Sequence, residues 1–152
     1  MLVYRIGKLK HSKDLSGEGA RLNGGRWNHK LIPCIYTSES RSLALLEYSV
    51  NVNLENIPRA LTITSIEIPT QSILTITEKQ LPGNWRSIPI ATSTKDYGTK
   101  LLQSNSYAVI KIPSAIMPSE FNYILNPLHF LHKSFKIKNV QDLLYDIRIK
   151  LT

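Results

Sequence analysis

The residues best suited to chemistry lie together in residues 17–47. A glycine-rich segment, Gly17-Glu18-Gly19-Ala20, precedes Gly24-Gly25-Arg26-Trp27-Asn28, and Tyr36 and Glu47 follow. An arginine can bind a phosphate through two parallel hydrogen bonds, an aromatic ring can stack on a nicotinamide, and a carboxylate can stabilise positive charge at a sugar carbon. This combination points to the cleavage of NAD.

Each of these residues also has a purely structural interpretation. Two adjacent glycines permit positive φ or close approach to a ligand, which places Arg26 at the edge of a turn. Arg26 could equally be a surface residue stacked on Trp27. Tyr36 could belong to the core, and Glu47 could face solvent from a helix. Glu47 has apolar neighbours, however, and a carboxylate in such surroundings needs a partner, such as Arg26 or a ribose hydroxyl.

Short strands dominate the elements that must position these residues. Alternating apolar and β-branched residues predict strands over residues 3–6, 33–37, 60–68, 72–77 and 107–112. One helix is predicted over residues 38–50, where Ser38 or Ser40 can cap the first turn, and a second over residues 92–104. Two Pro-Ser pairs make the segment after residue 112 a structured loop.

The tail, residues 135–151, fits both kinds of element. Its hydrophobic residues from Val140 to Leu151 recur at helical spacing, whereas every second residue from Tyr145 to Ile149 is large and apolar, as in a strand. We favour strands here, and the choice for residues 139–151 stays open.

The length of 152 residues fits one domain, spanning residues 1–152, that can bury a core without disulfides or metals. Hydrophobic residues make up 42% of the chain and charged residues 20%, as in ordinary globular proteins. Few long helices are available to connect parallel strands. We therefore expect an α+β fold with a mixed, largely antiparallel sheet.

The cysteine and apolar content of the chain bear on its metal binding and its cellular compartment. Cys34 is the only cysteine, which excludes an intramolecular disulfide and a multi-cysteine zinc site. His129 and His132 have no further ligand type at a suitable spacing, so no metal is expected. The chain shows neither a signal-peptide pattern nor an apolar run long enough to span a membrane. We expect a cytoplasmic protein.

The net charge of +8 arises from 19 Lys and Arg against 11 Asp and Glu. Such a surface attracts polyanions or an acidic protein. The basic residues are spread along the chain and do not gather on one helix face, so direct nucleic-acid binding is disfavoured.

Seven segments, in order and spacing, resemble the RES domain, a family named for its Arg, Glu and Ser. They are Tyr4-Arg5, Ser16-Gly17-Glu18-Gly19-Ala20, Gly24-Gly25-Arg26-Trp27-Asn28, Ile35-Tyr36-Thr37-Ser38, Leu45-Leu46-Glu47, Pro113-Ser114-Ala115 and Asn122-Tyr123-Ile124-Leu125-Asn126-Pro127-Leu128-His129. The resemblance implies a fold similar to that of the ADP-ribosyltransferase toxins. It also implies a toxin of a bacterial toxin–antitoxin pair that consumes NAD.

The same resemblance suggests roles for single residues. Arg26, Glu47 and Ser114 would be the name-giving residues, with Glu47 stabilising an oxocarbenium-like sugar. Arg26 and Arg5 would hold the pyrophosphate or an attacking phosphate. Tyr36 would be the aromatic residue of the pocket, and Ser114 would bind the carboxamide or orient the arginine.

Asn126 belongs to the last matching segment and is a further candidate for NAD binding. An asparagine before a proline is also a common turn device, and we favour that structural interpretation.

The expected function is NAD depletion by a phosphorylase or glycohydrolase, with NAD as substrate and inorganic phosphate as a candidate co-substrate. The alternatives are mono-ADP-ribosylation of a host protein and, less favoured, a non-enzymatic basic binding module. The expected partner is a cognate antitoxin of the Xre type, acidic enough to meet the basic surface. A homodimer is left open.

Overall fold

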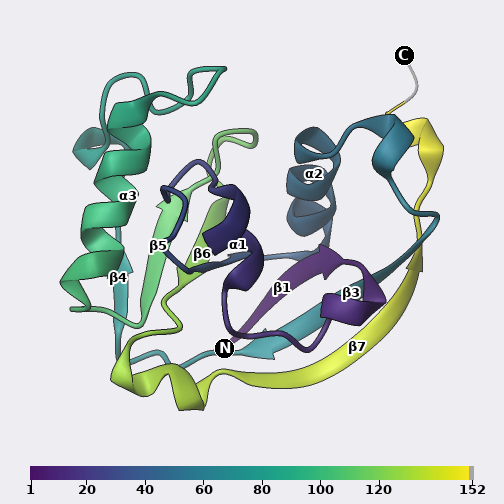
Figure 1. Cartoon of the computed structure of the whole chain (residues 1–152), viewed down its shortest axis with the longest axis horizontal. Helices are drawn as coiled ribbons and strands as arrows, with labels where there is room; N and C mark the ends of the chain where they lie inside the picture. Colours follow the sequence, from purple (N-terminus) through teal and green to yellow (C-terminus); the bar gives the residue numbers. More distant parts are fainter. Residues whose placement is uncertain (151–152) are drawn as a thin grey trace.

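The described part of the chain is built around one seven-stranded sheet (Figure 1). The computed structural model describes residues 1–150. The strands are β1 Leu2–Gly7, β2 Ile35–Ser38, β3 Ala60–Glu67, β4 Ile73–Thr75, β5 Val109–Pro113, β6 Phe121–Leu125 and β7 Lys136–Leu144, in the spatial order β4-β5-β6-β2-β1-β3-β7. Within these residues β4 and β5 form the single parallel pair, and the other pairs are antiparallel. The expected mixed, largely antiparallel α+β fold is confirmed.

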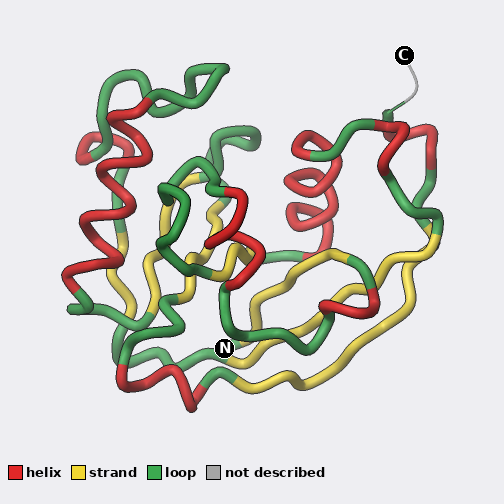
Figure 2. The backbone as a smooth tube through the Cα atoms, viewed as in Figure 1, coloured by secondary structure: helices red, strands yellow, loops and turns green. Residues whose placement is uncertain are grey.

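Within residues 1–150, three α-helices accompany the sheet: α1 Glu18–Asn23, α2 Arg41–Asn51 and α3 Thr92–Ser104. In Figure 1, α3 stands beside β4 and β5, α2 lies above the end of β1, and α1 crosses the space between them. Short 3-10 helices fill the connections, at Leu9–His11, Leu54–Asn56, Glu78–Gln80, Phe130–Ser134 and Ile147–Ile149. Figure 2 shows how much of the remaining chain is loop, especially at the top of the view, where α2 ends and α3 begins.

Helix α2 begins where the chain leaves β2. The hydroxyl of Ser40 accepts a hydrogen bond from the N–H of Leu43 at 3.1 Å and so caps the first turn. Leu43 and Ala44 are buried beneath the helix. The predicted helix over residues 38–50 therefore starts three residues later than expected, because Ser38 still belongs to β2.

Helix α3 matches its predicted range and packs unusually close to the arginine-bearing turn. Thr94, Gly98 and Leu102 recur every four residues on its buried face. A Cβ atom at Gly98 would lie only 2.1 Å from the carbonyl oxygen of Trp27. Glycine at this position thus lets the helix press directly against the backbone next to Arg26.

The core lies on both faces of the sheet, as alternation along β5 shows. Ile110 and Ile112 pack with Trp27 and Leu102 on the α3 side. Val109 points to the opposite face, where it joins a cluster around Val3 and Phe135. Both faces of β5 are therefore buried at Val109, Ile110 and Ile112, and only the partly exposed Lys111 interrupts its apolar sequence.

Three segments have a structure that the sequence patterns did not predict. The glycine-rich stretch forms α1, with Gly17 in the left-handed region at φ 75° just before it. Residues 121–125, for which no strand was predicted, form β6. The strand expected over residues 72–77 ends at Thr75, since Thr77 and Gln80 form a capping box that starts a 3-10 helix.

The tail is mainly a strand, as favoured. β7 runs from Lys136 to Leu144 and pairs with β3 along its length. Tyr145 is then buried, and Ile147–Ile149 form a 3-10 helix in place of a further strand. Residue 151 lies outside the described residues.

Candidate active site

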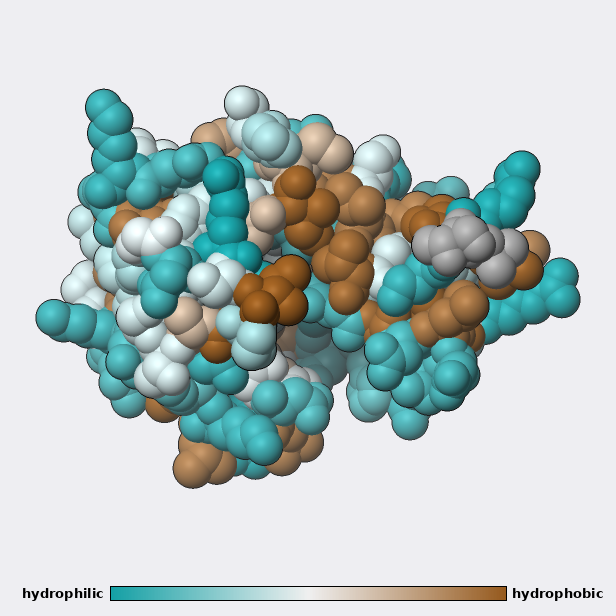
Figure 3. All heavy atoms as spheres, turned by 90° about the horizontal axis from the view of Figure 1, so that it is seen from above, coloured by the Kyte–Doolittle hydropathy of each residue, from teal (hydrophilic) through white to brown (hydrophobic). Residues whose placement is uncertain are grey.

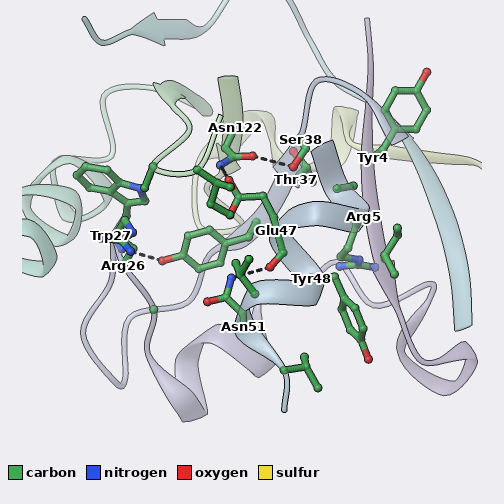
Figure 4. Close-up of a pocket in the computed structure, with 18 of the residues that line it drawn as sticks. Tyr4, Arg5, Arg26, Trp27, Thr37, Ser38, Glu47, Tyr48, Asn51 and Asn122 are labelled. Carbon is green, nitrogen blue, oxygen red and sulfur yellow. Dashed lines mark hydrogen bonds between the residues drawn. The ribbon is translucent and has the colours of Figure 1, made fainter. Parts of the chain in front are cut away.

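A cavity of about 440 Å³ opens between α2, the central strands and the glycine–arginine turn. Its volume is in the range of small-molecule sites, roughly 300–1,000 Å³. Residues from distant parts of the sequence meet in it, among them Arg5, Arg26, Glu47 and Asn122 (Figure 4). Tyr36 also lines the cavity. Seen from above, the molecular surface is hollowed near its middle, and hydrophobic residues gather beside the hollow (Figure 3).

One face of α2 forms a wall of this cavity. Ala44, Glu47, Tyr48 and Asn51 all line it, and their spacing of three, four and seven residues places them on the same side of a helix. Glu47 therefore points into the cavity and not into bulk solvent. This spacing is a signal from which Tyr48 and Asn51 could have been inferred.

Two side chains donate hydrogen bonds to the same oxygen of Glu47. Oε1 accepts from Ser114 Oγ at 2.9 Å and from Asn122 Nδ2 at 2.5 Å. Within residues 1–150 no side chain or backbone group donates to Oε2. One oxygen is thus anchored by the protein, and the other is available to a ligand.

Ser114 is almost completely buried, at 1% exposure, in the loop after β5. Its hydroxyl accepts the N–H groups of Ile116 and Met117, both at 3.1 Å, and donates its own proton to Glu47. The resemblance suggested that Ser114 would bind the carboxamide or orient the arginine. In the structure it orients the glutamate.

Arg26 leaves the tight turn formed by Gly24, with φ 69°, and the bridge between Gly25 and Asn28. Its Nη1 donates to the carbonyl of Trp85 at 2.7 Å and, more weakly, to that of Ser87 at 3.4 Å. Of the described residues, none accepts from Nη2 or Nε.

Burial lowers the pKa of Arg26, and the nearby carboxylate of Glu47 opposes that shift. An arginine remains charged at neutral pH after such a change. Arg26 is therefore a half-buried cation with free donors beside a carboxylate.

The ring of Tyr36 lines the cavity, while its hydroxyl is fully used inside the protein. It donates to Asn28 Oδ1 at 2.6 Å and accepts the N–H of Trp27 at 3.0 Å. A Cβ atom at Gly25 would come within 2.7 Å of this hydroxyl, so glycine is required there. Burial raises the pKa of Tyr36 well above its usual value, and the hydroxyl stays neutral.

Arg5 also lines the cavity, but its guanidinium is engaged elsewhere. Nη1 donates to the carbonyl of Asp14, and Nη2 donates to those of Ser12 and His11. Burial lowers its pKa, and the carboxylate of Asp14 opposes this. Arg5 thus holds the loop around the Leu9–His11 helix against β1 and contributes positive charge to the wall.

Asn126 lies apart from the cavity. Its amide donates to the carbonyl of Leu102 and to Asn105 Oδ1, and its Oδ1 accepts the N–H of Leu128. All of these partners belong to the end of α3 or to the turn after β6. The structural interpretation of this asparagine describes the observed contacts, and we leave Asn126 out of the site.

Like Tyr48 and Asn51, Ser38 and Asn122 line the cavity but were not identified as site residues from the sequence. Both lie within segments that resemble the RES family, yet neither stood out by type. Their importance comes from pairing across β2 and β6, which no local pattern reveals.

The site combines a carboxylate that has one free oxygen, an arginine with free donors and an aromatic wall. It can bind an anion and stabilise a positive charge at the same time. Among the described residues no cluster of three His, Cys, Asp or Glu could hold a metal ion. Over the same residues, no helix is both long and apolar enough to cross a membrane.

Comparison with known proteins identifies the family to which this chain is similar. Residues 2–147 match the RES domain family. A protein named Toxin Res from Yersinia enterocolitica serotype O:8 is 37% identical over 155 residues, covering 99% of this chain and 100% of the relative. The Prs ADP-ribosylating toxin of Sphingobium sp. strain YBL2 is 36% identical over 140 residues, covering 90% of this chain and 86% of the relative.

Among solved structures, a chain of the M. tuberculosis MbcT-MbcA toxin–antitoxin complex has the same fold. Its TM-score is 0.75 at 20% sequence identity, and the match covers 94% of this chain and 84% of that one. The family match over nearly the full length, the close relatives and the shared fold agree. This chain belongs to the RES domain family.

Proposed function

We propose that this chain is the toxin of a toxin–antitoxin pair and that it depletes NAD by cleaving the nicotinamide–ribose bond. The observation that carries this proposal is the carboxylate of Glu47, which lines the cavity together with Arg26 and is anchored through Oε1, while no described residue donates to Oε2. The names of the Yersinia and Sphingobium relatives support a toxin, and the second also supports chemistry on ADP-ribose.

This reaction needs little help from a general acid. The C–N bond breaks toward the positively charged nicotinamide ring, which leaves as a neutral molecule and keeps the bonding electrons. The sugar carbon C1′ gains positive charge, and a negative group held nearby stabilises it. Glu47 would provide that charge and hydrogen-bond a ribose hydroxyl. An acceptor O–H then bonds to C1′ and loses its proton.

The remaining residues would bind and orient the dinucleotide. Arg26 would grip the pyrophosphate, or an attacking phosphate, with the donors that the protein leaves free. The ring of Tyr36 would stack on the nicotinamide or cover the ribose. Arg5 would add positive charge, and Ser114 would act through Glu47.

The reaction can be tested by product analysis of NAD with the purified protein, with and without inorganic phosphate. Phosphorolysis yields nicotinamide and ADP-ribose 1″-phosphate only when phosphate is present, whereas hydrolysis yields free ADP-ribose in both cases. Glu47→Gln should lose most activity, while Glu55→Gln, an exposed glutamate in the Leu54–Asn56 helix, should retain it. NAD that stays intact under every condition would refute the proposal.

Mono-ADP-ribosylation of a protein is the second candidate, favoured by the name of the Sphingobium relative. The same cavity serves both reactions, because only the nucleophile differs. Radiolabelled NAD incubated with the protein and a host lysate separates them. A labelled protein band that disappears with Glu47→Gln indicates transfer, and label found only in small molecules indicates hydrolysis or phosphorolysis.

The partner would be an antitoxin, as in the MbcT-MbcA complex. We propose that this antitoxin is of the Xre type and that the pair acts in the cytoplasm. We also propose that the antitoxin is acidic, because the net charge of +8 favours association with an acidic surface. Association should then slow as salt rises from about 0.05 to 0.5 M. An association rate that is independent of salt would contradict the electrostatic part of this proposal.

A further inference from the structure

Ser38 and Asn122 form a polar pair across two strands directly beneath Glu47. They are opposite each other in the antiparallel register of β2 and β6. Asn122 also lies opposite Ile112 in β5, two residues before Ser114. The sheet thus brings Ser38 and Asn122 together in the wall of the cavity, where Glu47 approaches Asn122 from α2 (Figure 4). Ser114 lies close by, since it donates to the same carboxylate.

The amide of Asn122 has a defined orientation. Ser38 Oγ donates to Asn122 Oδ1 at 2.7 Å, and Asn122 Nδ2 donates to Glu47 Oε1 at 2.5 Å. If the amide were reversed, its carbonyl oxygen would face the carboxylate and its NH₂ would face the serine. The carboxylate only accepts, so it excludes the reversed amide, while the hydroxyl of Ser38, which is 3% exposed, donates to the amide oxygen and holds the side chain in place.

The second donor to Glu47 is oriented in the same way. The hydroxyl of Ser114 accepts two backbone N–H groups, so its proton is left to point at Oε1. Two donors of fixed direction meet on a single oxygen. The carboxylate is then held in one rotation, with Oε2 on the side of the cavity.

We propose that Asn122, oriented by Ser38, is a positioning residue that fixes the carboxylate of Glu47 so that Oε2 meets the ribose of NAD. This inference rests on the proposed cleavage of NAD. Asn122 acts through Glu47 and not on the reacting atoms themselves. Loss of its NH₂ should lower kcat on the order of 10- to 100-fold, with less than about a threefold change in KM.

Asn122→Asp gives the sharpest test, because its effect depends on pH. At mildly acidic pH one proton is shared between Asp and Glu47, and the protonated acid donates to Oε1 as the amide did. As pH rises, both groups ionise and repel each other. The variant should therefore approach wild-type kcat near pH 4.5 and fall at least tenfold below it by about pH 8.

The other ionisable groups that line the cavity do not obscure this profile. They are arginines and tyrosines: Tyr4, Arg5, Arg26, Tyr36 and Tyr48. An arginine stays charged throughout this range, and burial raises the pKa of Tyr36 and of Tyr48. A new inflection between pH 4.5 and 8 would thus belong to the carboxylate pair. Asn139→Asp, the same change at an exposed position of β7, should follow the wild-type profile.

Ser38→Ala and Asn122→Ala complete the test. Ser38→Ala should lower kcat less than Asn122→Ala, since it removes the constraint on the amide but keeps its NH₂. Crystal structures of both variants provide a readout that does not need turnover, and the carboxylate of Glu47 should occupy a different or a second rotamer. An unchanged single rotamer together with wild-type kcat, or a wild-type pH profile for Asn122→Asp, would overturn the inference.

The two proposals can fail separately. If the wild-type protein leaves NAD intact, the proposed function is wrong, whatever the rotamer of Glu47 in the variants. If the wild-type protein cleaves NAD and Glu47→Gln does not, but Asn122→Asp behaves as Asn139→Asp does, only the positioning role is wrong.

Discussion

Ser114 Oγ lies 2.9 Å from Glu47 Oε1, although 67 residues separate the two along the chain. The serine stands in the loop after β5, and the glutamate stands on α2. Glu47 and Ser114, which the resemblance suggested as the Glu and Ser of the family name, are therefore one hydrogen-bonded unit. Because Ser114 is buried, we expect it to act through the glutamate and not by direct contact with a ligand.

Ser114→Ala should damage both activity and stability. It removes one donor from Glu47 and leaves the N–H groups of Ile116 and Met117 without their acceptor. We expect kcat to fall on the order of 10- to 100-fold and the free energy of unfolding to fall by about 1–3 kcal/mol. Steady-state kinetics with NAD and urea unfolding measure these effects. Ser42→Ala, at an exposed serine of α2, serves as control. A wild-type kcat for Ser114→Ala would contradict the proposed role of Ser114.

Arg26→Ala should chiefly raise KM for NAD, by about tenfold or more, because the free donors of Arg26 would be lost. Arg26→Lys should not restore KM, since an ammonium group cannot make two parallel hydrogen bonds to phosphate.

Arg26→Ala should also loosen the loop over residues 82–91, because Arg26 donates hydrogen bonds to the carbonyl groups of Trp85 and Ser87 in this loop. Hydrogen exchange in this loop should accelerate. Arg86→Ala is a matched control, because Arg86 is exposed on the same loop and pairs with Glu78. Faster exchange with an unchanged KM would assign Arg26 to the loop alone.

Gly98→Ala should destabilise the fold by about 1–3 kcal/mol or more, because its Cβ would collide with the carbonyl of Trp27. Relief of this clash would move the turn that carries Arg26, so KM for NAD should rise as well. Thermal unfolding and kinetics report both effects. Gly19→Ala is the helical control, since its Cβ would meet nothing within 4 Å and should be neutral or stabilising. Equal melting temperatures for the two variants would contradict the packing argument.

Stability should decline at alkaline pH. Burial raises the pKa of Cys34 to about 12 from an ordinary value of 9.0, and burial also raises the pKa of Tyr36. Both groups ionise more readily in the unfolded chain. The stabilisation is therefore complete below pH 9 and is lost as pH rises toward the folded-state value.

Urea unfolding at several values between pH 8 and pH 11 measures this slope. Cys34→Ala should make the slope shallower, because it removes one of the two groups. The native thiol should also resist alkylation at pH 8 and react once the protein is unfolded, since the thiolate is the nucleophile. Rapid alkylation of the native protein would contradict the burial of Cys34.

Local patterns in the sequence were sufficient for most of the elements. Helix α3 agrees with its predicted range, and the cap of α2 at Ser40 was one of two candidates. Local rules were less informative where long-range pairing decides the structure. β6 forms because residues 121–125 lie between β2 and β5, each of which offers backbone partners, and such pairing leaves no periodic trace in the segment itself.

For the site, the sequence by itself determined which kinds of group are present: a carboxylate at Glu47, cations at Arg5 and Arg26, and an aromatic ring at Tyr36. Their direct partners were decided by the tertiary structure. The donors of Arg5 are taken up by backbone carbonyls, whereas Arg26 keeps some of its donors free. The physical reason is that a hydrogen bond depends on distance and direction across elements, and spacing along the chain does not encode these. Only the sheet register places Ser38 against Asn122, and only the docking of α2 places Glu47 above them.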